Sequence, residues 1–227
     1  ARVSAPAGHT PEEARGAFAA TLCYLLWGLV PLYWRQLAGV DPVELIAHRH
    51  LWSLALLLGV LAVQRRLSSV GAAFASRRSF AINALGAILL TGNWLVYVWG
   101  VNTGHVIETS LGYFLVPLVN VAAGHFVLHE HLRRAQRLAI GLAALGVILM
   151  IVQLGRPPWI ALTLAGTWGG YSLLRKQSPL PAATGLAIET LLLAPLALAF
   201  LAWLQFRGVG AMGHTDSVTI PATMSAE

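Results

Sequence analysis

Two apolar runs between residues 79 and 131 are joined by a short polar segment, Asn102 to Glu108, and six side chains in and beside it could bind a small polar solute. These residues are Asn93, Tyr97, His105, Glu108, Tyr113 and Asn120. Amide, phenol and carboxylate groups exchange hydrogen bonds with a solute, and a carboxylate also takes up or releases a proton. Asn93 and Tyr97 share one face of a helix because they are four residues apart. His105 approaches Glu108 if the next helix begins before Val106.

Glu108 is the strongest candidate of the six, since its carboxylate could titrate as a solute or a proton enters. A second role is open to it, because a carboxylate in the first turn of a helix complements the positive end of the helix dipole, worth about 0.3–1 kcal/mol. His105 could equally be a solvated loop residue. Pro117 frees backbone carbonyls and predicts a kink close to Tyr113 and Asn120.

A second polar group lies earlier in the chain. Glu44, His48 and Trp52 are spaced by four residues and share a helix face, with Arg49 about 100 degrees round the helix. This spacing predicts an inward polar stripe near the outer membrane boundary. Alternatively, Glu44 and Arg49 lie at the interface, where they extend to water and anchor the helix.

Ionisable groups in apolar stretches are costly. Glu44, Arg49, Glu108 and Glu189 would together cost about 10 kcal/mol if they lay unpaired at the centre of a bilayer. We therefore expect these residues to be paired, to lie near an interface or to face water.

The composition requires a membrane environment. Hydrophobic residues make up 57% of the 227 residues and charged residues 11%, with a mean hydropathy of +0.68, so that a soluble domain would lack polar surface. The sequence therefore predicts an all-α, polytopic membrane helix bundle. About 20 apolar residues cross a bilayer as a helix. Seven such stretches occur, at residues 17–37, 43–63, 79–101, 107–128, 136–154, 158–175 and 184–204. Gly112 and Gly124 are expected to let helices pack closely.

The seven stretches divide into a set of five and a set of two. Residues 17–154 hold the first five helices, and residues 158–204 hold the other two. Trp27-Gly28 in the first helix matches Trp168-Gly169 in the sixth. A five-helix repeat has an odd number of helices, so its second copy is inserted upside down. The match indicates a complete repeat followed by the first two helices of an inverted copy.

The remaining segments carry little chemistry. Residues 1–16 and 208–227 are rich in Ala, Gly, Pro, Ser, Thr and His, and we expect disordered tails there, the first of them cytoplasmic. Cys23 is the only cysteine, which excludes an intrachain disulfide. The net charge of +6 comes from short basic clusters between apolar runs, which argues against a nucleic-acid partner.

The segment HFVLHEH, residues 125–131, is the main indication of metal chemistry. His125 and His129 share a helix face, but the pattern of two histidines and a glutamate typical of metalloproteases is absent. The segment also lies beside Arg133 and Arg134 at a helix end, so we expect a solvated loop without a metal. With no nucleophile motif and no cysteine cluster in the sequence, we expect neither enzymatic activity nor a cofactor.

The positions of Lys and Arg predict the orientation in the membrane. With a cytoplasmic N-terminus, eleven basic residues lie on the cytoplasmic side, namely Arg2, Arg15, Arg65, Arg66, Arg77, Arg78, Arg133, Arg134, Arg137, Arg175 and Lys176. Four lie on or near the other side, namely Arg35, Arg49, Arg156 and Arg207. The bias favours a cytoplasmic N-terminus.

Four strings carry a resemblance to a known family. They are ELIAHRHLWS (44–53), GNWLVYVWGVNTGHVIETSLGYFLVPLVN (92–120), HEHLRRAQ (129–136), and RK followed by IET (175–190). The chain resembles the RarD family over residues 18–206, which comprises chloramphenicol-sensitivity-type proteins of the EamA group in the drug/metabolite transporter superfamily. The resemblance implies a ten-helix carrier of the bacterial inner membrane, with two inverted five-helix repeats around a central cavity. Two departures stand out: His129 replaces a glycine that commonly precedes Glu130, and helices 8 to 10 are absent from this sequence.

We therefore expect secondary transport of a small solute; a proton is one candidate for the coupling ion, which the sequence leaves open. The alternative is a non-transporting part of a split or truncated carrier, or a membrane interaction protein. The expected partners are the lipid bilayer, the solute and a proton, and in the alternative case a C-terminal three-helix half or a second copy of the chain. Without helices 8 to 10, the inward polar groups of the last two helices, including Glu189, are expected to face lipid or an aberrant partner, so that the chain inserts but does not transport as a monomer.

The orientation is testable by cysteine labelling. With Cys23 replaced by Ser, single cysteines at Ser69 and Thr103 should react with a membrane-impermeant thiol reagent from opposite sides of the membrane. In intact cells, only the cysteine at position 103 should be labelled. Labelling of both positions from outside would contradict the orientation.

Overall fold

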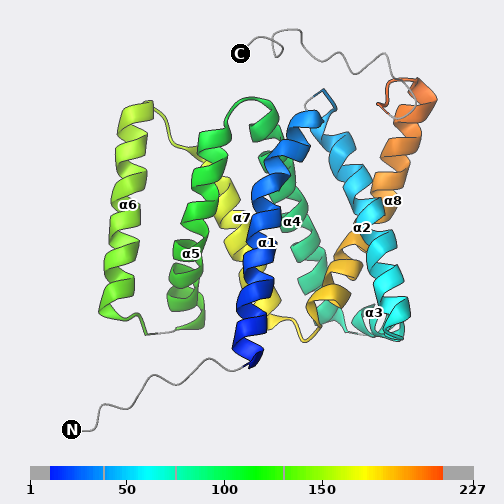
Figure 1. Cartoon of the computed structure of the whole chain (residues 1–227), viewed down its shortest axis with the longest axis horizontal. Coiled ribbons are helices and arrows are strands. Elements are labelled where there is room, and N and C mark those ends of the chain that lie inside the picture. The colour runs from blue at the N-terminus through cyan, green and yellow to red at the C-terminus, as the bar shows by residue number, and fades with distance from the viewer. Residues whose placement is uncertain (1–10, 38, 75, 130, 212–227) are drawn as a thin grey trace. The chain divides into compact units, whose positions relative to one another are not determined.

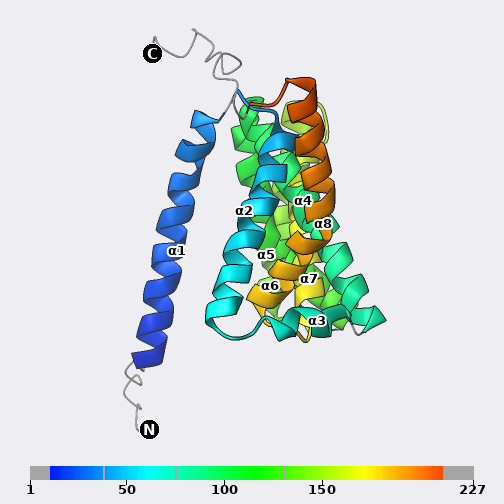
Figure 2. The same cartoon turned by 90° about the vertical axis from the view of Figure 1, so that its right-hand side faces the viewer.

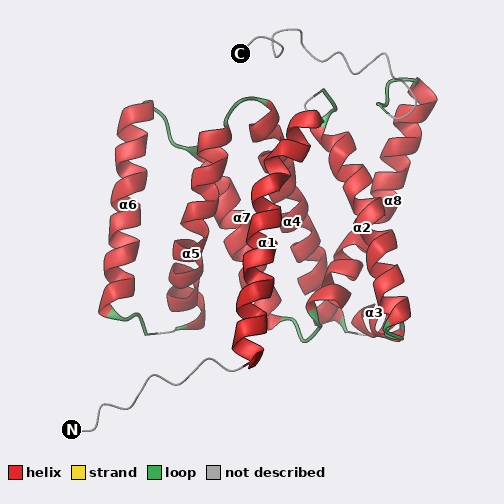
Figure 3. Ribbon diagram, in the orientation of Figure 1, coloured by secondary structure: helices red, strands yellow, loops and turns green. Residues whose placement is uncertain are grey.

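The computed structural model describes residues 11–37, 39–74, 76–129 and 131–211, and this part of the chain contains eight α-helices and no strand (Figure 3). The helix α1, Pro11–Gln36, belongs to a first compact unit, and the other helices belong to a second unit that begins at Gly39. The helices of the second unit are α2 (Pro42–Val63), α3 (Ser68–Phe74), α4 (Arg77–Asn102), α5 (Val106–Leu128), α6 (Arg134–Leu154), α7 (Trp159–Gln177) and α8 (Ala182–Arg207). The all-α prediction is confirmed, and each of the seven predicted stretches forms a helix.

Local signals in the sequence set the helix ends. Asp41 accepts hydrogen bonds from the backbone N–H groups of Val43 (2.7 Å) and Glu44 (3.4 Å), and so caps the start of α2. Gly155 ends α6 and Gly208 ends α8, at φ angles of 65° and 63°, a left-handed conformation that glycine adopts without strain. The sequence-based bounds are therefore accurate to a few residues, except that α1 begins at Pro11 rather than at residue 17. Residues 1–10 and 212–227, which include most of the two expected tails, lie outside the described residues.

The short helix α3 was not predicted from the sequence. It spans seven residues between α2 and α4, at the end of the second unit where α2 ends and α4 begins (Figure 2). The hydroxyl groups of Ser69 in α3 and Thr184 in α8 are 3.2 Å apart, so α3 is attached to the first turn of α8. A segment of this length carries no apolar periodicity that could reveal it in the sequence.

Within the second unit, α7 and α8 pack among the helices that precede them. Figure 1 shows α7 between α5 and α4, α8 beside α4 and α2, and α6 beside α5 at the edge, in agreement with the helix contacts. Since successive helices reverse direction, α8 runs opposite to α2, with which it is packed. Leu115 of α5 and Ala161 and Ala165 of α7 form a buried apolar cluster at the α5–α7 interface.

Six described helices are long and apolar enough to cross a membrane. They correspond to α1, α2, α4, α5, α6 and α8. The helix α7 is not among them, although it was one of the seven predicted spans. Its 19 residues include two threonines, three glycines and two basic residues in the last turn. Helices α4 and α5 pack against α7, and its two threonines, Thr163 and Thr167, are half-buried.

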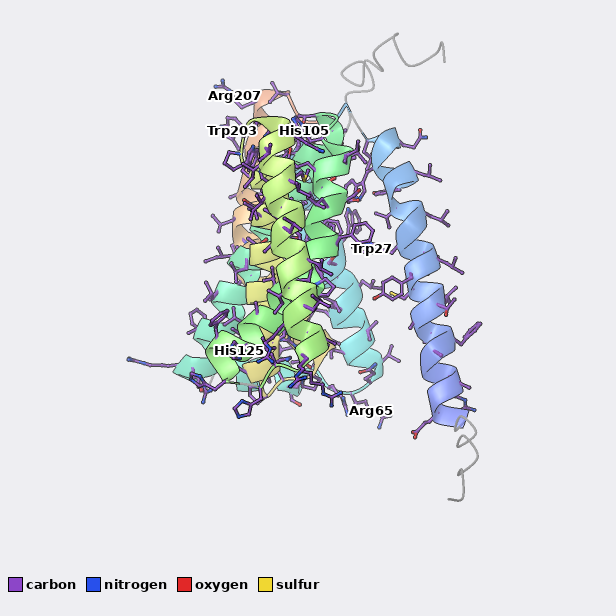
Figure 4. All side chains as sticks on the ribbon, turned by 90° about the vertical axis from the view of Figure 1, so that its left-hand side faces the viewer. Trp27, Arg65, His105, His125, Trp203 and Arg207 are labelled. Carbon is purple, nitrogen blue, oxygen red and sulfur yellow. The ribbon has the colours of Figure 1, made fainter. Side chains whose placement is uncertain are left out.

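The two ends of the second unit differ in charge. Figure 4 shows Arg65 and His125 at one end and His105, Trp203 and Arg207 at the other. The connections at the first end carry most of the basic residues of this unit, namely Arg65, Arg66, Arg77, Arg78, Arg133, Arg134, Arg137, Arg175 and Lys176. The helix connectivity therefore brings the predicted basic loops to one side.

The close approach of α5 and α7 makes Gly112 sensitive to substitution. A Cβ at Gly112 would lie 2.8 Å from the Cβ of Leu164 and 3.1 Å from the carbonyl oxygen of Ala161, which confirms the expected packing role of this glycine. We expect Gly112→Ala to lower the stability by about 1–3 kcal/mol through overpacking. Thermal unfolding in detergent micelles measures the effect.

Gly166→Ala is the matched control, because a Cβ at Gly166 on α7 meets no atom within 4 Å. This substitution should leave the midpoint of unfolding unchanged or raise it, since alanine favours the helix over glycine. Equal effects of the two substitutions would contradict the close α5–α7 packing.

Candidate functional site

Asn93 on α4 lies at the centre of a buried polar cluster that joins three helices. Its Nδ2 atom donates to the carbonyl oxygen of Leu164 (3.0 Å) and to Oγ1 of Thr167 (2.9 Å), both on α7. Its Oδ1 atom accepts a hydrogen bond from the hydroxyl of Tyr113 on α5, at 3.3 Å. Asn93 is only 1% exposed, and these bonds satisfy its amide in an apolar environment. The amide therefore fixes the positions of α4, α5 and α7 at this depth.

A continuous row of aromatic side chains extends from this cluster along the helices. We call Trp94, Tyr97, Tyr113, Trp168 and Tyr171 the aromatic row. Successive ring centroids are separated by 5.7, 5.6, 6.2 and 6.0 Å, within the range of favourable edge-to-face contacts. The predicted proximity of Asn93 and Tyr97 is confirmed, because both contact Tyr113. The row brings together residues of α4, α5 and α7.

An arginine lies at the first end of the aromatic row. The Cζ atom of Arg49 on α2 is 4.3 Å from the centroid of the Trp94 ring, a cation–π contact. Arg49 thus faces α4, whereas Glu44 and His48 face α8. No ion pair between described residues involves Arg49.

At its second end the aromatic row reaches a buried ion pair. The hydroxyl of Tyr171 donates to Oε2 of Glu189 on α8 at 3.0 Å, and Nη1 of Arg175 lies 3.7 Å from Oε1 of the same carboxylate. Glu189 is 2% exposed. The expectation that Glu189 faces lipid is therefore wrong, because α4 and α7 enclose this part of α8. The Arg175 guanidinium also donates to the carbonyl oxygens of Leu180 and Pro181, each at 3.4 Å.

Glu108 and His105 do not join the Asn93 cluster. His105 was expected to approach Glu108 only if the helix began before Val106. The helix α5 begins at Val106, with His105 as its N-cap residue, so this condition is not met. Glu108 accepts a hydrogen bond from Nη2 of Arg156 at 3.2 Å, while the His105 ring stacks on Trp99 with a centroid distance of 5.5 Å. Glu108 is buried but Arg156 is largely exposed, so that this ion pair lies at the end of the helices.

The predicted stripe of Glu44, His48 and Trp52 lines a separate groove between α2 and α8 with a volume of about 730 Å³. Glu44 is 4% exposed, its Oε1 atom accepts a hydrogen bond from the backbone N–H of Ala211 at 2.8 Å, and His48 Nε2 lies 3.9 Å away. The carboxylate is thus paired within the groove.

The remaining candidates have different surroundings. Asn120 lies on the face of α5 that is turned toward α7. A Cβ at Gly169 of α7 would lie 3.7 Å from the Oδ1 atom of Asn120. At the end of α5, His129 adopts a left-handed conformation with φ of 56°. Among the described residues, no three His, Cys, Asp or Glu side chains come together as a metal site.

Sequence reasoning missed Trp94, Trp168, Tyr171 and Arg175 as parts of the site. A usable signal was present, because Trp94 and Tyr97 are three residues apart on α4, and Trp168 and Tyr171 are three residues apart on α7. Residues at this spacing lie on one helix face. Two such aromatic pairs on different helices indicate faces that can meet.

Comparison with known proteins identifies relatives of the chain. Residues 14–152 match the model of the EamA-like transporter family. The chain is 40% identical to an uncharacterized transporter of Pseudomonas aeruginosa over 215 residues, 41% identical to protein RarD of Streptomyces exfoliatus over 197 residues, and 36% identical to protein RarD of Escherichia coli over 190 residues. These matches cover 95%, 87% and 84% of the chain, and 71%, 62% and 64% of the relatives. The chain thus spans about two thirds of the length of these relatives. No solved structure matches it.

The buried ion pair predicts a non-additive pattern of stability. Arg175→Met leaves the Glu189 carboxylate buried without its cation, and we expect a loss of about 3 kcal/mol. The double substitution Arg175→Met with Glu189→Gln removes both charges and should recover most of this loss. Thermal unfolding in detergent micelles measures both effects.

Lys176→Met removes an adjacent, exposed positive charge and serves as the control, with an expected change of less than about 0.5 kcal/mol. Additive losses from Arg175→Met and Glu189→Gln would contradict the ion pair.

Proposed function

The chain belongs to the EamA-like transporter family, and we propose that it is a multi-pass secondary transporter of the bacterial inner membrane. In this proposal a small solute moves along the aromatic row, and a proton couples its movement. Residues 14–152, which the family model matches, contain Arg49, Asn93 and the first three members of the row. The matched part therefore includes the end of the path at which the solute is first bound.

The continuity of contacts between Arg49 and Arg175 is the observation that carries the proposal. Arg49 contacts Trp94, the aromatic row leads to Tyr171, and Tyr171 binds Glu189, which pairs with Arg175. Ionisable groups at membrane depth are costly unless they pair with one another or face a polar path.

The depth of these groups supports a path across the bilayer. With a rise of 1.5 Å per residue, Arg49 lies about 10 Å from the start of α2 and Tyr113 about 10 Å from the start of α5. Tyr171 lies about 18 Å and Arg175 about 24 Å from the start of α7. Since α2, α5 and α7 all start at the same end of the second unit, the path from Arg49 to Arg175 covers about 14 Å, or about half of a hydrocarbon core of about 30 Å.

Glu189 is the better candidate for the proton-binding group. Its carboxylate is buried and contacts the row through Tyr171, so its protonation would weaken its attraction for Arg175 at a position where a solute passes. Glu108 lies at a helix end and pairs with the largely exposed Arg156. The preference for Glu108 that the sequence suggested thus gives way to Glu189.

The proposed orientation has the N-terminus in the cytoplasm. It is supported by the basic connections at one end of the second unit, since Lys and Arg are retained on the cytoplasmic side. Tyr171, Glu189 and Arg175 would then lie toward the cytoplasm, and Arg49 toward the periplasm. The proposed solute path would begin at Arg49 on the periplasmic side.

Transport by the purified full chain in liposomes tests the function. Labelled amino acids, nucleosides, amphenicol drugs and aromatic acids are offered with and without an imposed pH gradient. Because Glu189 is enclosed rather than exposed to lipid, the reason for expecting no transport by this chain is removed. We therefore expect at least one class of solute to enter faster than into empty liposomes, and to accumulate when the gradient is imposed. Absence of uptake for every class would contradict transport by this chain.

Two buried glutamates allow a matched comparison. Glu189→Gln should retain solute exchange without a gradient but lose accumulation driven by the pH gradient, because glutamine keeps the size and the hydrogen bond to Tyr171 and cannot take up a proton. Glu108→Gln should retain both activities. The opposite pattern, with accumulation lost only in Glu108→Gln, would return proton coupling to Glu108.

A further inference from the structure

Arg49 differs from the other buried charged residues of the second unit in having no ionic partner among the described residues. The carboxylates described between residues 39 and 211 are those of Asp41, Glu44, Glu108 and Glu189. Each of them is engaged elsewhere: Asp41 caps α2, and the three glutamates bind Ala211, Arg156 and Arg175, respectively. The positive charge of Arg49 is therefore balanced by no carboxylate in this part of the chain.

The contact with Trp94 compensates only part of the cost of this charge. A cation–π contact is weaker than the penalty for an unpaired guanidinium at membrane depth. Arg49 is half-buried, as are Tyr113, Trp168 and Tyr171, so that these side chains keep accessible surface. A partly accessible cation beside half-buried aromatic rings has the composition of a site for an anion with a flat apolar body.

We propose that Arg49 and the aromatic row bind a solute that carries one carboxylate on an aromatic body. The planar guanidinium donates two parallel hydrogen bonds to a carboxylate, which places the negative charge at the first end of the row. The half-buried rings of Tyr113 and Trp168 then offer edges and faces to the aromatic body of the solute. This inference names the substrate class of the transport path, and so rests on the proposed function.

The surrounding groups select against other charge types. Both N–H donors of the Asn93 amide are used by Leu164 and Thr167, so it has no donor left for additional polar groups of a solute. An ammonium group would find no free carboxylate to balance its charge among the described residues, because Glu189, which contacts the end of the row, already binds Arg175 and Tyr171. A single arginine also balances one negative charge rather than the two of a phosphate monoester. The site therefore favours monocarboxylates over zwitterions, amines and dianions.

A series of ligands with the same phenyl body tests this selectivity. The purified full chain in detergent micelles is titrated with phenylacetate, 2-phenylethanol, L-phenylalanine and 2-phenylethylamine, and binding is followed by tryptophan fluorescence. Because a charge-assisted, two-point hydrogen bond is lost with the alcohol, phenylacetate should bind at least about tenfold more tightly than 2-phenylethanol. The zwitterion and the amine should bind no more tightly than the alcohol. Equal affinities across the series would overturn the proposal.

Substitutions assign the selectivity to Arg49. Arg49→Gln should reduce the affinity for phenylacetate about tenfold, to that of 2-phenylethanol, and leave the affinity for the alcohol unchanged. Arg49→Lys keeps the charge but loses the planar fork, so its affinity for phenylacetate should be intermediate. Unchanged binding of phenylacetate by Arg49→Gln would overturn the proposal.

The second unit contains a matched control. Arg207 also lies over a tryptophan, with its Cζ atom 5.9 Å from the Trp203 ring, but at an exposed helix end. Arg207→Gln should bind phenylacetate as the unsubstituted chain does, and an equal loss in both variants would overturn the assignment to Arg49. Retained binding of 2-phenylethanol shows that Arg49→Gln is folded. If Arg49→Gln does not fold, the affinities of Arg49→Lys and of the unsubstituted chain for the ligand series test the proposal.

The binding assay separates this inference from the proposed function. Selective binding of phenylacetate without uptake into liposomes would support the carboxylate site and contradict transport by the chain. Uptake of other solutes without selective binding of phenylacetate would support transport and overturn the carboxylate site.

Discussion

The ion pair between Glu189 and Arg175 fits between the helices because two glycines leave room for it. A Cβ at Gly86 on α4 would lie 3.0 Å from Oε1 of Glu189, and a Cβ at Gly185 on α8 would overlap the Arg175 guanidinium. In a bilayer the backbone of a helix is already satisfied, so that charged side chains must find partners on neighbouring helices. The charges can thus be buried only because α4, α7 and α8 approach closely at these glycines. The positions of α7 and α8 depend on this close approach.

The same close packing brings the aromatic side chains into one row. Gly112 allows α5 to lie against Ala161 and Leu164 of α7, and Asn93 joins α4 to the same segment of α7. Tyr113 then lies between Tyr97 and Trp168. Small residues at the interfaces and aromatic residues beside them therefore act together, since the first bring the backbones close and the second fill the remaining space.

The two arginines of the path illustrate how burial differs from pairing. Arg175 has a carboxylate and two carbonyl oxygens within reach, and it stabilises the arrangement of α7 and α8. Arg49 has an aromatic ring and no carboxylate among the described residues. A residue whose charge is balanced within the protein is engaged there, whereas one whose charge is not balanced is available to a ligand. This difference underlies the choice of Arg49 as the binding residue.

The sequence by itself determined the helices, because a run of about 20 apolar residues can satisfy its backbone in a membrane only as a helix. It also determined which residues share a face, as for Asn93 with Tyr97 and for Glu44 with His48. The tertiary structure alone decided which faces meet. Tyr113 contacts Asn93 across a helix connection, and Glu189 is enclosed rather than exposed to lipid. His105 and Glu108 separate because α5 begins at Val106, one residue after the cap. Helical periodicity fixes directions within one helix, but the partners of a side chain depend on the crossing of helices far apart in the sequence, which packing determines.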